Sequence, residues 1–375
     1  MNMSTNPFLV NGYFSKKYFC DRKQEVSNLL NFVKNGSNVT LVSPRRIGKT
    51  GLIFRTFENF KDFTPLYVDI MPTRSLEEFI KVVSEAIMKN FSEKTTIGKK
   101  FMAFIKNLRP LISYDTVTGQ PQIQIAYQAE PEKTQTLHNI LQFLDSQESP
   151  IVMAIDEFQQ IREYPEKNIE ALLRSEIQLL KNVRFIFCGS KKSIMIDMFS
   201  NSKNPFYAST NFLTLDKISN EKYADFIVKM FALNCVEIDE ECVDFILKWT
   251  KTYTFYTQSI CNRLYSLNIK KITLDDVRKI CKDTLEQQAN VYFQLRQLLT
   301  TAQWNYLIAI AKEDHIEQPT AQQFLMKYKI GTAANSKRLL KSLCEKELIL
   351  EMPSLEKTSY QIYDVFFDRW LKENY

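Results

Sequence analysis

Glycine, histidine and tryptophan are scarce in this chain. The shortage of histidine excludes several kinds of catalytic and metal site, and the shortage of glycine draws attention to each one present. The 375 residues contain 8 glycines, 2 histidines and 3 tryptophans. With only His138 and His315, the sequence argues against a histidine-based metal site and against a Ser/His catalytic triad. Because glycine is so rare, each one is a candidate for a position where the backbone needs unusual freedom.

The seven cysteines do not form a recognisable framework. They are odd in number, they are spread from Cys20 to Cys344, and no two of them stand in a C-x-x-C pair. This pattern favours free thiols packed in helices and strands over disulfides or a thiolate metal site.

Long apolar runs are also missing. No stretch approaches the roughly 18 apolar residues that cross a membrane, and the beginning, MNMSTNPFLVNGYF, lacks the apolar centre of a secretory signal. The sequence therefore predicts a cytoplasmic protein without a membrane span. The net charge of +6 is mild, so it permits a polyanionic partner without indicating one.

Short apolar runs alternate with amphipathic stretches in the first 215 residues or so. Because the runs are apolar throughout rather than alternating, they predict strands of a parallel sheet that is covered on both faces. The predicted strands are 38–43, 65–70, 150–156, 184–190 and 212–216, and the predicted helices between them are 50–59, 76–90, 136–146 and 169–181. Repeated units of this kind build a three-layer α/β domain.

Three later segments have different patterns. In 111–127, Thr118-Gly119 indicates a turn before alternating apolar residues, which predicts an inserted hairpin; it is either a partner surface or a packing decoration. Residues 218–290 are wholly helical in pattern. In 291–375, three helices precede a strand, a turn, a strand and a last helix, which is the order of a winged helix.

The segment 43–50, SPRRIGKT, follows the first predicted strand and opens a helix. It matches the phosphate-binding pattern G-x-x-x-x-G-K-[ST], with Ser43 at the first glycine. A helix N-terminus offers free N–H groups to phosphate, Gly48 lets the backbone approach, Lys49 reaches the β- and γ-phosphates, and Thr50 binds Mg²⁺. We expect Ser43 to adopt the tight turn less readily than glycine without abolishing binding. The predicted nucleotide-binding residues are Ser43, Pro44, Arg45, Arg46, Ile47, Gly48, Lys49, Thr50 and Gly51.

A second chemical signal lies about a hundred residues further on, where the apolar run 151–155 ends in Asp156 and Glu157. A buried strand that delivers two carboxylates at its end suits Walker-B chemistry. Asp156 would hold Mg²⁺ with Thr50, and Glu157 would orient and polarise the attacking water. We therefore predict a catalytic role for Glu157 and Lys49. Together with the phosphate-binding loop, this strand predicts ATP hydrolysis and not binding alone.

Ser190, at the end of the next predicted strand, is a candidate catalytic sensor of the γ-phosphate, and a plain strand-to-loop turn is the alternative. Arg45, Arg46 and Arg174 are candidates for stabilising charge in the transition state, and solvated surface arginines are the alternative for each. The predicted fold class is α/β. It comprises a three-layer P-loop NTPase domain with a five-stranded parallel core sheet (1–217), an all-α lid (218–290) and a winged-helix-like domain (291–375).

These segments resemble the archaeal-type ATPase family, in the STAND branch related to AAA+ proteins. The matching pieces are YFCDRKQE at 18–25, SPRRIGKT, IDEFQ, FCGS, PFY at 205–207 and the tail YDVFF at 363–367. The resemblance covers about residues 15–290 and extends to that tail. It implies that Arg22 and Glu25 lie beside the nucleotide base, and that the lid after Asp216 closes over it.

Two segments differ from the family pattern. Ala208-Ser209 stand where the family often has Gly-Arg, and the lid pattern G-x-P-x-x-x-Q appears as 252–258, TYTFYTQ, without its glycine and proline. Both differences bear on how the lid senses nucleotide and on the rate of hydrolysis.

The sequence thus predicts a Mg²⁺-dependent ATPase that binds ATP and ADP and acts as a nucleotide-controlled switch, with a protein partner or self-association. The alternative is a nucleic-acid-binding regulator whose nucleotide site is regulatory or weakly active. Residues 296–375 hold 11 Lys and Arg against 10 Asp and Glu, which gives DNA binding weak support. Lys337, Arg338 and Lys341 nevertheless lie on the predicted recognition helix. A small-molecule kinase would share the P-loop but not the Asp-Glu strand or the lid.

Overall fold

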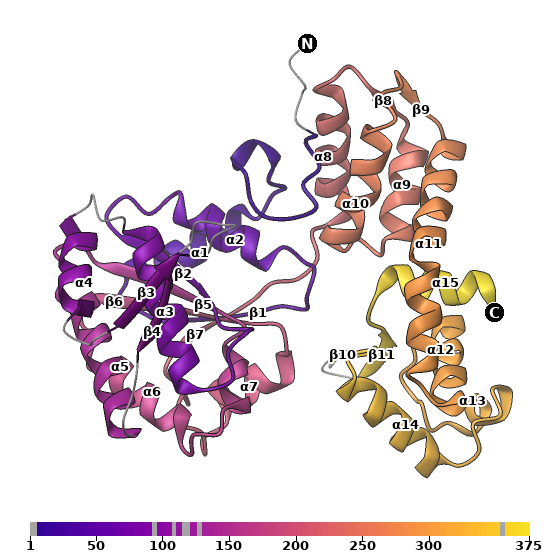
Figure 1. Cartoon of the computed structure of the whole chain (residues 1–375). Coiled ribbons are helices and arrows are strands. Elements are labelled where there is room, and N and C mark those ends of the chain that lie inside the picture. Colours follow the sequence, from indigo (N-terminus) through magenta and orange to yellow (C-terminus); the bar gives the residue numbers. More distant parts are fainter. Residues whose placement is uncertain (1–5, 92–95, 107–109, 115–120, 126–129, 353–356) are drawn as a thin grey trace. The chain divides into compact units, whose positions relative to one another are not determined.

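The computed structural model describes residues 6–91, 96–106, 110–114, 121–125, 130–352 and 357–375. They form two compact units (Figure 1). The first is Asn11–Ile218, and the second combines residues 6–10 with Ser219–Tyr375. Among the helices described, none has the length and apolar character needed to cross a bilayer.

The first unit is built on a five-stranded sheet in the order β2-β5-β6-β1-β7. Every neighbouring pair in this sheet is parallel, so the predicted parallel core sheet is confirmed. The chain therefore returns to the same edge after each strand, and all five carboxyl ends meet there. The strands are β1 (Val39–Val42), β2 (Thr64–Asp69), β5 (Ile151–Asp156), β6 (Val183–Gly189) and β7 (Asn211–Thr214).

Helices surround this sheet (Figure 1). α2, α3 and α6 lie where the apolar periodicity predicts them, whereas α4, α7 and the short helix η2 lie in segments without a predicted element. The helices are α1 (Lys23–Lys34), α2 (Lys49–Phe57), α3 (Leu76–Asn90), α4 (Thr96–Lys106), α5 (Glu130–Asp145), α6 (Ile169–Gln178) and α7 (Lys192–Ser200), with the 3₁₀ helices η1 (Lys16–Tyr18) and η2 (Phe158–Glu163).

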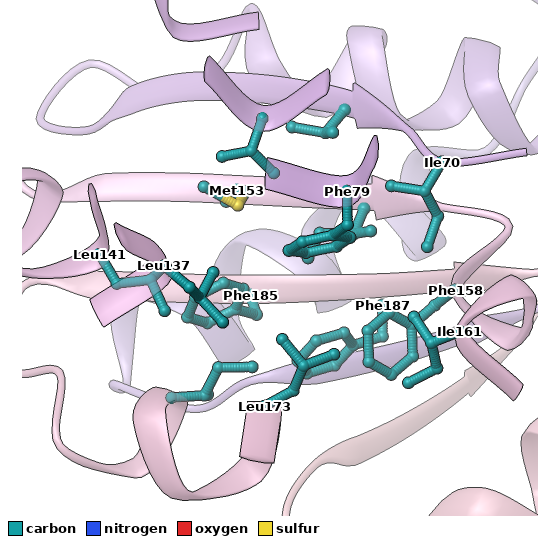
Figure 2. Close-up of a cluster of buried hydrophobic side chains, with 14 of the residues drawn as sticks. Ile70, Phe79, Leu137, Leu141, Met153, Phe158, Ile161, Leu173, Phe185 and Phe187 are labelled. Atoms are coloured by element: carbon teal, nitrogen blue, oxygen red, sulfur yellow. The ribbon is translucent and has the colours of Figure 1, made fainter. Parts of the chain in front are cut away.

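An aromatic cluster in the core holds η2 against the sheet (Figure 2). Phe158 is fully buried, and its ring centroid lies 4.5 Å from that of Phe187 on β6 and 5.9 Å from that of Phe199 on α7. Aromatic pairs at such distances add to the stability that burial itself provides. Because Phe158 directly follows Glu157, this packing also fixes the backbone of a predicted catalytic residue.

A small antiparallel ribbon lies in the segment predicted to be a hairpin. β3 (Pro110–Tyr114) pairs with β4 (Pro121–Ile125), with Leu111 opposite Gln124. The predicted turn at Thr118-Gly119 is outside the described residues.

The second unit begins with helices and ends in a winged helix, as predicted. The part predicted to be all-α also contains a parallel pair of two-residue strands, Glu237–Ile238 with Lys271–Ile272, which are too short to leave a periodic pattern in the sequence. Its first part contains α8 (Asn220–Ala232), β8 (Glu237–Ile238), α9 (Glu240–Trp249), α10 (Thr254–Tyr265), β9 (Lys271–Ile272) and α11 (Leu274–Gln297). Its second part contains α12 (Thr301–Glu313), α13 (Gln322–Lys327), α14 (Ala333–Glu345), the antiparallel pair β10 (Ile349–Met352) and β11 (Ser359–Ile362), and α15 (Val365–Asn374).

A cluster of four charges joins the two parts of this unit. The ammonium of Lys251, just after α9, lies 3.0 Å from a carboxylate oxygen of Asp314 and 3.0 Å from one of Asp368. Lys372 pairs with the same two carboxylates at 2.5 and 3.1 Å. Nearby, Arg369 donates hydrogen bonds to the carbonyls that end α9. The turn between α9 and α10 is therefore held by the last helix of the chain.

Thr252 occupies the position of the glycine in the family's lid pattern, and it keeps a backbone that suits glycine. Its φ of 56° is in the left-handed region, which a β-branched residue rarely adopts. The strain is held by a hydrogen bond that the Thr252 hydroxyl donates to Asn220 Oδ1, at 2.8 Å. The change from glycine thus leaves the turn's shape in place and adds strain to it.

We expect Asp368→Ala to lower the free energy of unfolding by about 3 kcal/mol, because it removes a partner of two buried or half-buried ammonium groups. The Asp368 side chain is 0% exposed and that of Lys251 is 11% exposed. The matched control is Glu286→Ala, which breaks an exposed pair with Lys282 and should cost less than about 0.5 kcal/mol. Urea unfolding followed by circular dichroism measures both, and equal losses would contradict the importance of the cluster.

Candidate functional site

Three loops at the carboxyl edge of the sheet bring the predicted site residues together. β1 leads into the 43–48 loop, β5 ends at Asp156, and β6 leads to Ser190. Because β6 lies between β1 and β5, these three loops are neighbours at one edge. In open parallel sheets, ligands bind at this kind of edge.

The loop before α2 has the shape of an anion cradle. Gly48 is the residue before the helix, with φ of 97°, and α2 begins at Lys49. Arg46 also has a positive φ, of 69°. Ser43 does not: its backbone N–H continues the β1–β6 pairing and donates to the carbonyl of Gly189 at 3.3 Å. The expected difficulty of a serine at this position is therefore absent, because the tight turning occurs at Arg46 and Gly48.

The other side chains of this loop differ in how far they are exposed to solvent. Ile47 is buried, Pro44 and Arg45 are half-buried, and Arg46 is exposed. Gly51, in the first turn of α2, has a packing role, since a Cβ there would lie 3.3 Å from the ring of Phe19. The absence of a side chain at Gly51 lets the segment before α1 rest directly on α2.

Lys49 joins the phosphate-binding loop to the acidic end of β5. Its Nζ lies 2.7 Å from Asp156 Oδ1 and 3.2 Å from Glu157 Oε1. Lys49 is 8% exposed and Asp156 is 4% exposed. Two buried carboxylates side by side are strongly unfavourable without a cation, and this ammonium supplies the opposite charge beside both.

The charges of this cluster shift the pKa of Lys49 and the pKa of Glu157. Burial alone would lower the pKa of Lys49, but the carboxylates of Asp156 and Glu157 outweigh it and raise the pKa above its usual value. Burial alone would raise the pKa of Glu157, but the Lys49 ammonium and hydrogen bonds from Ser190 and Gln159 lower it. Both residues are therefore ionised at neutral pH.

The oxygen atoms at this site suit Mg²⁺. The Thr50 hydroxyl donates to Asp156 Oδ2 at 3.2 Å, so the two predicted metal ligands are adjacent. Among the residues described, no group of three acidic, histidine or cysteine side chains forms a metal cage. The Thr50–Asp156 pair fits Mg²⁺, which is usually held by one or two protein oxygens together with phosphate and water.

Tyr67 is a site residue that sequence reasoning missed. Its hydroxyl, on β2, donates to Asp156 Oδ2 at 2.8 Å, and its ring centroid lies 4.9 Å from that of Phe54 on α2. Burial and the charge of Asp156 raise the pKa of Tyr67, so it stays a donor that orients the carboxylate. No motif marks it, because the contact depends on β2 pairing with β5.

Ser190 and Arg45 both join the network. The Ser190 hydroxyl donates to Glu157 Oε2 at 2.6 Å and accepts a hydrogen bond from Arg45 Nε at 3.2 Å. Arg46 is exposed, and Arg174 lies on α6, outside this network. The geometry thus places Ser190 and Arg45, but not Arg174, beside the carboxylates.

Arg22 lies in the segment that precedes α1, in a strained and buried position. Its φ is 63° and it is 4% exposed. One guanidinium nitrogen donates to Glu25 Oε1 at 2.9 Å, and the other terminal nitrogen is buried without a hydrogen-bond partner among the described residues. A buried donor left without a partner is costly, which is consistent with the predicted contact between this pair and a nucleotide.

The sheet order, the loop before α2 and the acidic end of β5 define a P-loop NTPase in which one strand separates the two motif-bearing strands. Sequence comparison gives the family. Residues 19–253 match the ATPase domain found predominantly in Archaea, and the chain belongs to this family. Residues 290–373 match a probable winged helix domain.

Solved structures share this fold over the whole chain. A Walker-type ATPase of Pyrococcus abyssi is 17% identical, with a TM-score of 0.66 over 98% of this chain and 99% of its own. The ORC2 protein of Aeropyrum pernix is 14% identical, with a TM-score of 0.59 over 99% and 98%. The ORC1 protein of the same organism, solved in complex with DNA, is 11% identical, with a TM-score of 0.54 over 99% and 97%. No curated protein matches by sequence.

Replacing Lys49 with alanine should weaken ATP binding by roughly 100-fold, because a buried ammonium at the start of α2 is lost. Isothermal titration calorimetry with ATP and Mg²⁺ measures the change. Lys61→Ala, which alters an exposed lysine in the same unit, is the control and should bind ATP normally. Undiminished binding by the Lys49 variant would show that the nucleotide site lies elsewhere.

Proposed function

We propose that this protein is a Mg²⁺-dependent ATPase whose nucleotide state controls a conformational switch. The observation that carries the proposal is the contact between Lys49 and Asp156, which joins the start of α2 to the end of β5 at 2.7 Å. Membership of the ATPase family supports ATP as the nucleotide. The backbone before α2 and the ammonium of Lys49 are the groups that would bind its phosphates.

Lys49 has to change partners for this function. In this structure its ammonium forms ion pairs with two carboxylates, and a bound triphosphate would compete for the same positive charge. Thr50 and Asp156 would hold Mg²⁺, which supplies a second positive charge beside the phosphates. The positive charge that Lys49 withdraws from the carboxylates is then replaced by the metal ion.

Glu157 is the proposed group that orients the attacking water. It follows the metal-binding carboxylate directly, its pKa is lowered, and Lys49 faces one of its oxygens. Ser190 and Arg45 form a chain of hydrogen bonds that ends on Glu157. This chain supports a role for Ser190 in sensing the γ-phosphate and for Arg45 in stabilising its charge.

The second element of the proposed function is the conformational switch. A STAND-type mechanism would use ATP binding to favour one arrangement of the helical and winged-helix parts, and hydrolysis to favour another. The charge cluster around Lys251 supports this idea, because its ion pairs link the turn before α10 to α15. A cytoplasmic location and a protein partner remain predictions from the sequence.

Glu157→Gln should bind ATP with wild-type affinity and release phosphate at least about 100-fold more slowly, because the amide cannot accept the proton of the attacking water. A coupled phosphate-release assay and a binding titration on the same preparation test both parts. The control is Glu163→Gln at the end of η2. Wild-type turnover by the Glu157 variant would remove this residue from the mechanism.

DNA contact through the winged helix is a second candidate function. Lys337, Arg338 and Lys341 all lie exposed on α14, and only Lys341 has an ion-pair partner among the described residues, Glu345 at 3.9 Å. Lys337 and Arg338 thus lack a carboxylate partner in this part of the chain, and such cations are available to phosphate. The related fold of the A. pernix ORC1 protein, solved in complex with DNA, supports testing this face.

If α14 binds DNA, the double variant Lys337→Ala/Arg338→Ala should weaken binding of a duplex by about tenfold at low salt and reduce its salt dependence. A double substitution of Lys279 and Lys282, on α11, is the charge-matched control. Fluorescence anisotropy at several salt concentrations measures both. Absence of binding by the wild-type protein at low ionic strength would eliminate this function.

A further inference from the structure

The two oxygens of Glu157 have different surroundings. Oε2 accepts two short hydrogen bonds, one from the Ser190 hydroxyl at 2.6 Å and one from Gln159 Nε2 at 2.5 Å. Oε1 has a single partner in the part of the chain that the structure describes, the Lys49 ammonium at 3.2 Å. Each carboxylate oxygen has two lone pairs, so Oε2 is fully occupied while Oε1 keeps one acceptor position.

Gln159 reaches this carboxylate from a buried position at the start of η2. It is the second residue of η2 and is 4% exposed. A Cβ built on Gly189, at the end of β6, would lie 2.6 Å from Gln159 Oε1, and it would also collide with Met195. Any larger residue at 189 would displace the amide. Gly189 therefore provides the space in which the Gln159 amide lies beside Glu157.

This arrangement of Gln159 is not explained by stability. Its Oε1 is buried without a hydrogen-bond partner among the described residues. A buried acceptor without a partner destabilises a fold, and an apolar side chain of similar shape would fill the same volume without that cost. Buried polar groups that are present although they lower the stability of the fold are characteristic of functional sites.

We propose that Gln159 is a positioning residue for ATP hydrolysis, which together with Ser190 anchors Oε2 of Glu157 and leaves Oε1 as the oxygen that accepts from the attacking water. The proposal rests on the ATPase function proposed above. When the phosphates attract Lys49, Oε1 loses its one charged neighbour and becomes free for water. Two donors on Oε2 keep the carboxylate from rotating to follow Lys49.

The second donor is needed for a geometric reason. One hydrogen bond to a carboxylate leaves it free to turn about that contact, whereas two donors from different elements hold its plane. Ser190 follows β6, and Gln159 belongs to η2. Preorganised groups of this kind lower a barrier because they need no rearrangement during the reaction.

The test compares Gln159→Met with Gln160→Met. Both substitutions replace an amide on η2 by an unbranched apolar side chain of similar length, but Gln160 donates to the carbonyl of Thr73 and not to Glu157. We expect Gln159→Met to lower kcat by at least about tenfold, with ATP affinity within about twofold of wild type and a Tm equal to or above wild type. Gln160→Met should retain wild-type kcat.

A crystal structure of each variant with Mg²⁺ and a non-hydrolysable ATP analogue gives a readout that does not depend on activity. In wild type and in Gln160→Met, Glu157 should adopt one conformation with Oε2 on Ser190. In Gln159→Met, we expect the Glu157 carboxylate to rotate or to occupy more than one conformation. In the Glu157→Gln background, adding Gln159→Met should cause no further loss of the residual rate.

Three results would overturn the proposal: an unchanged kcat in Gln159→Met, an unchanged Glu157 conformation, or a fall in Tm that parallels the fall in kcat. The last would show that Gln159 acts only through the fold. If the wild-type protein binds ATP but does not hydrolyse it, the proposed ATPase function fails, and the conformation of Glu157 in the crystals still decides whether Gln159 positions it.

Discussion

The ammonium of Lys49 is the group on which the whole site depends. It lies between two carboxylates that the end of β5 presents together, and it supplies the opposite charge that two carboxylates in so buried a place require. The sheet order brings this about, because the strand between β1 and β5 sets their separation. The same ammonium begins α2, where backbone N–H groups favour an anion. A phosphate that enters this site therefore competes with Asp156 and Glu157 for one positive charge.

Unusual backbone conformations gather around that ammonium. Arg46, Gly48 and Glu157 all have positive φ, and two of them carry side chains that rarely adopt it. The buried ring of Phe158, packed on Phe187, helps to hold Glu157 in this conformation. Strain of this kind persists only where the surrounding structure enforces it. In the second unit, Thr252 shows the same feature at the turn that the Lys251 cluster holds.

Much of the fold and part of the site could be predicted from the sequence, for identifiable reasons. The five strands were predictable because they are apolar on both faces, and the loop around Gly48 because its motif is local in sequence. Tyr67 was not marked, since its role depends on a hydrogen bond to Asp156 across paired strands. Gln159 appeared only as the last residue of IDEFQ, without a role, since its position beside Glu157 depends on space next to Gly189. Such contacts are set by tertiary packing, which no spacing in a single sequence records. The Ser43 turn was expected to be difficult, but its N–H continues the pairing with β6 and the positive φ values fall at Arg46 and Gly48.

The most direct test of this account is a crystal structure of the wild-type protein with a non-hydrolysable ATP analogue and Mn²⁺, in which anomalous scattering locates the metal. We expect Lys49 Nζ to leave Asp156 for the β- and γ-phosphates, and the metal to lie beside Thr50 and Asp156. A nucleotide bound away from α2, or a Lys49 that still pairs with Asp156 beside a bound triphosphate, would contradict it.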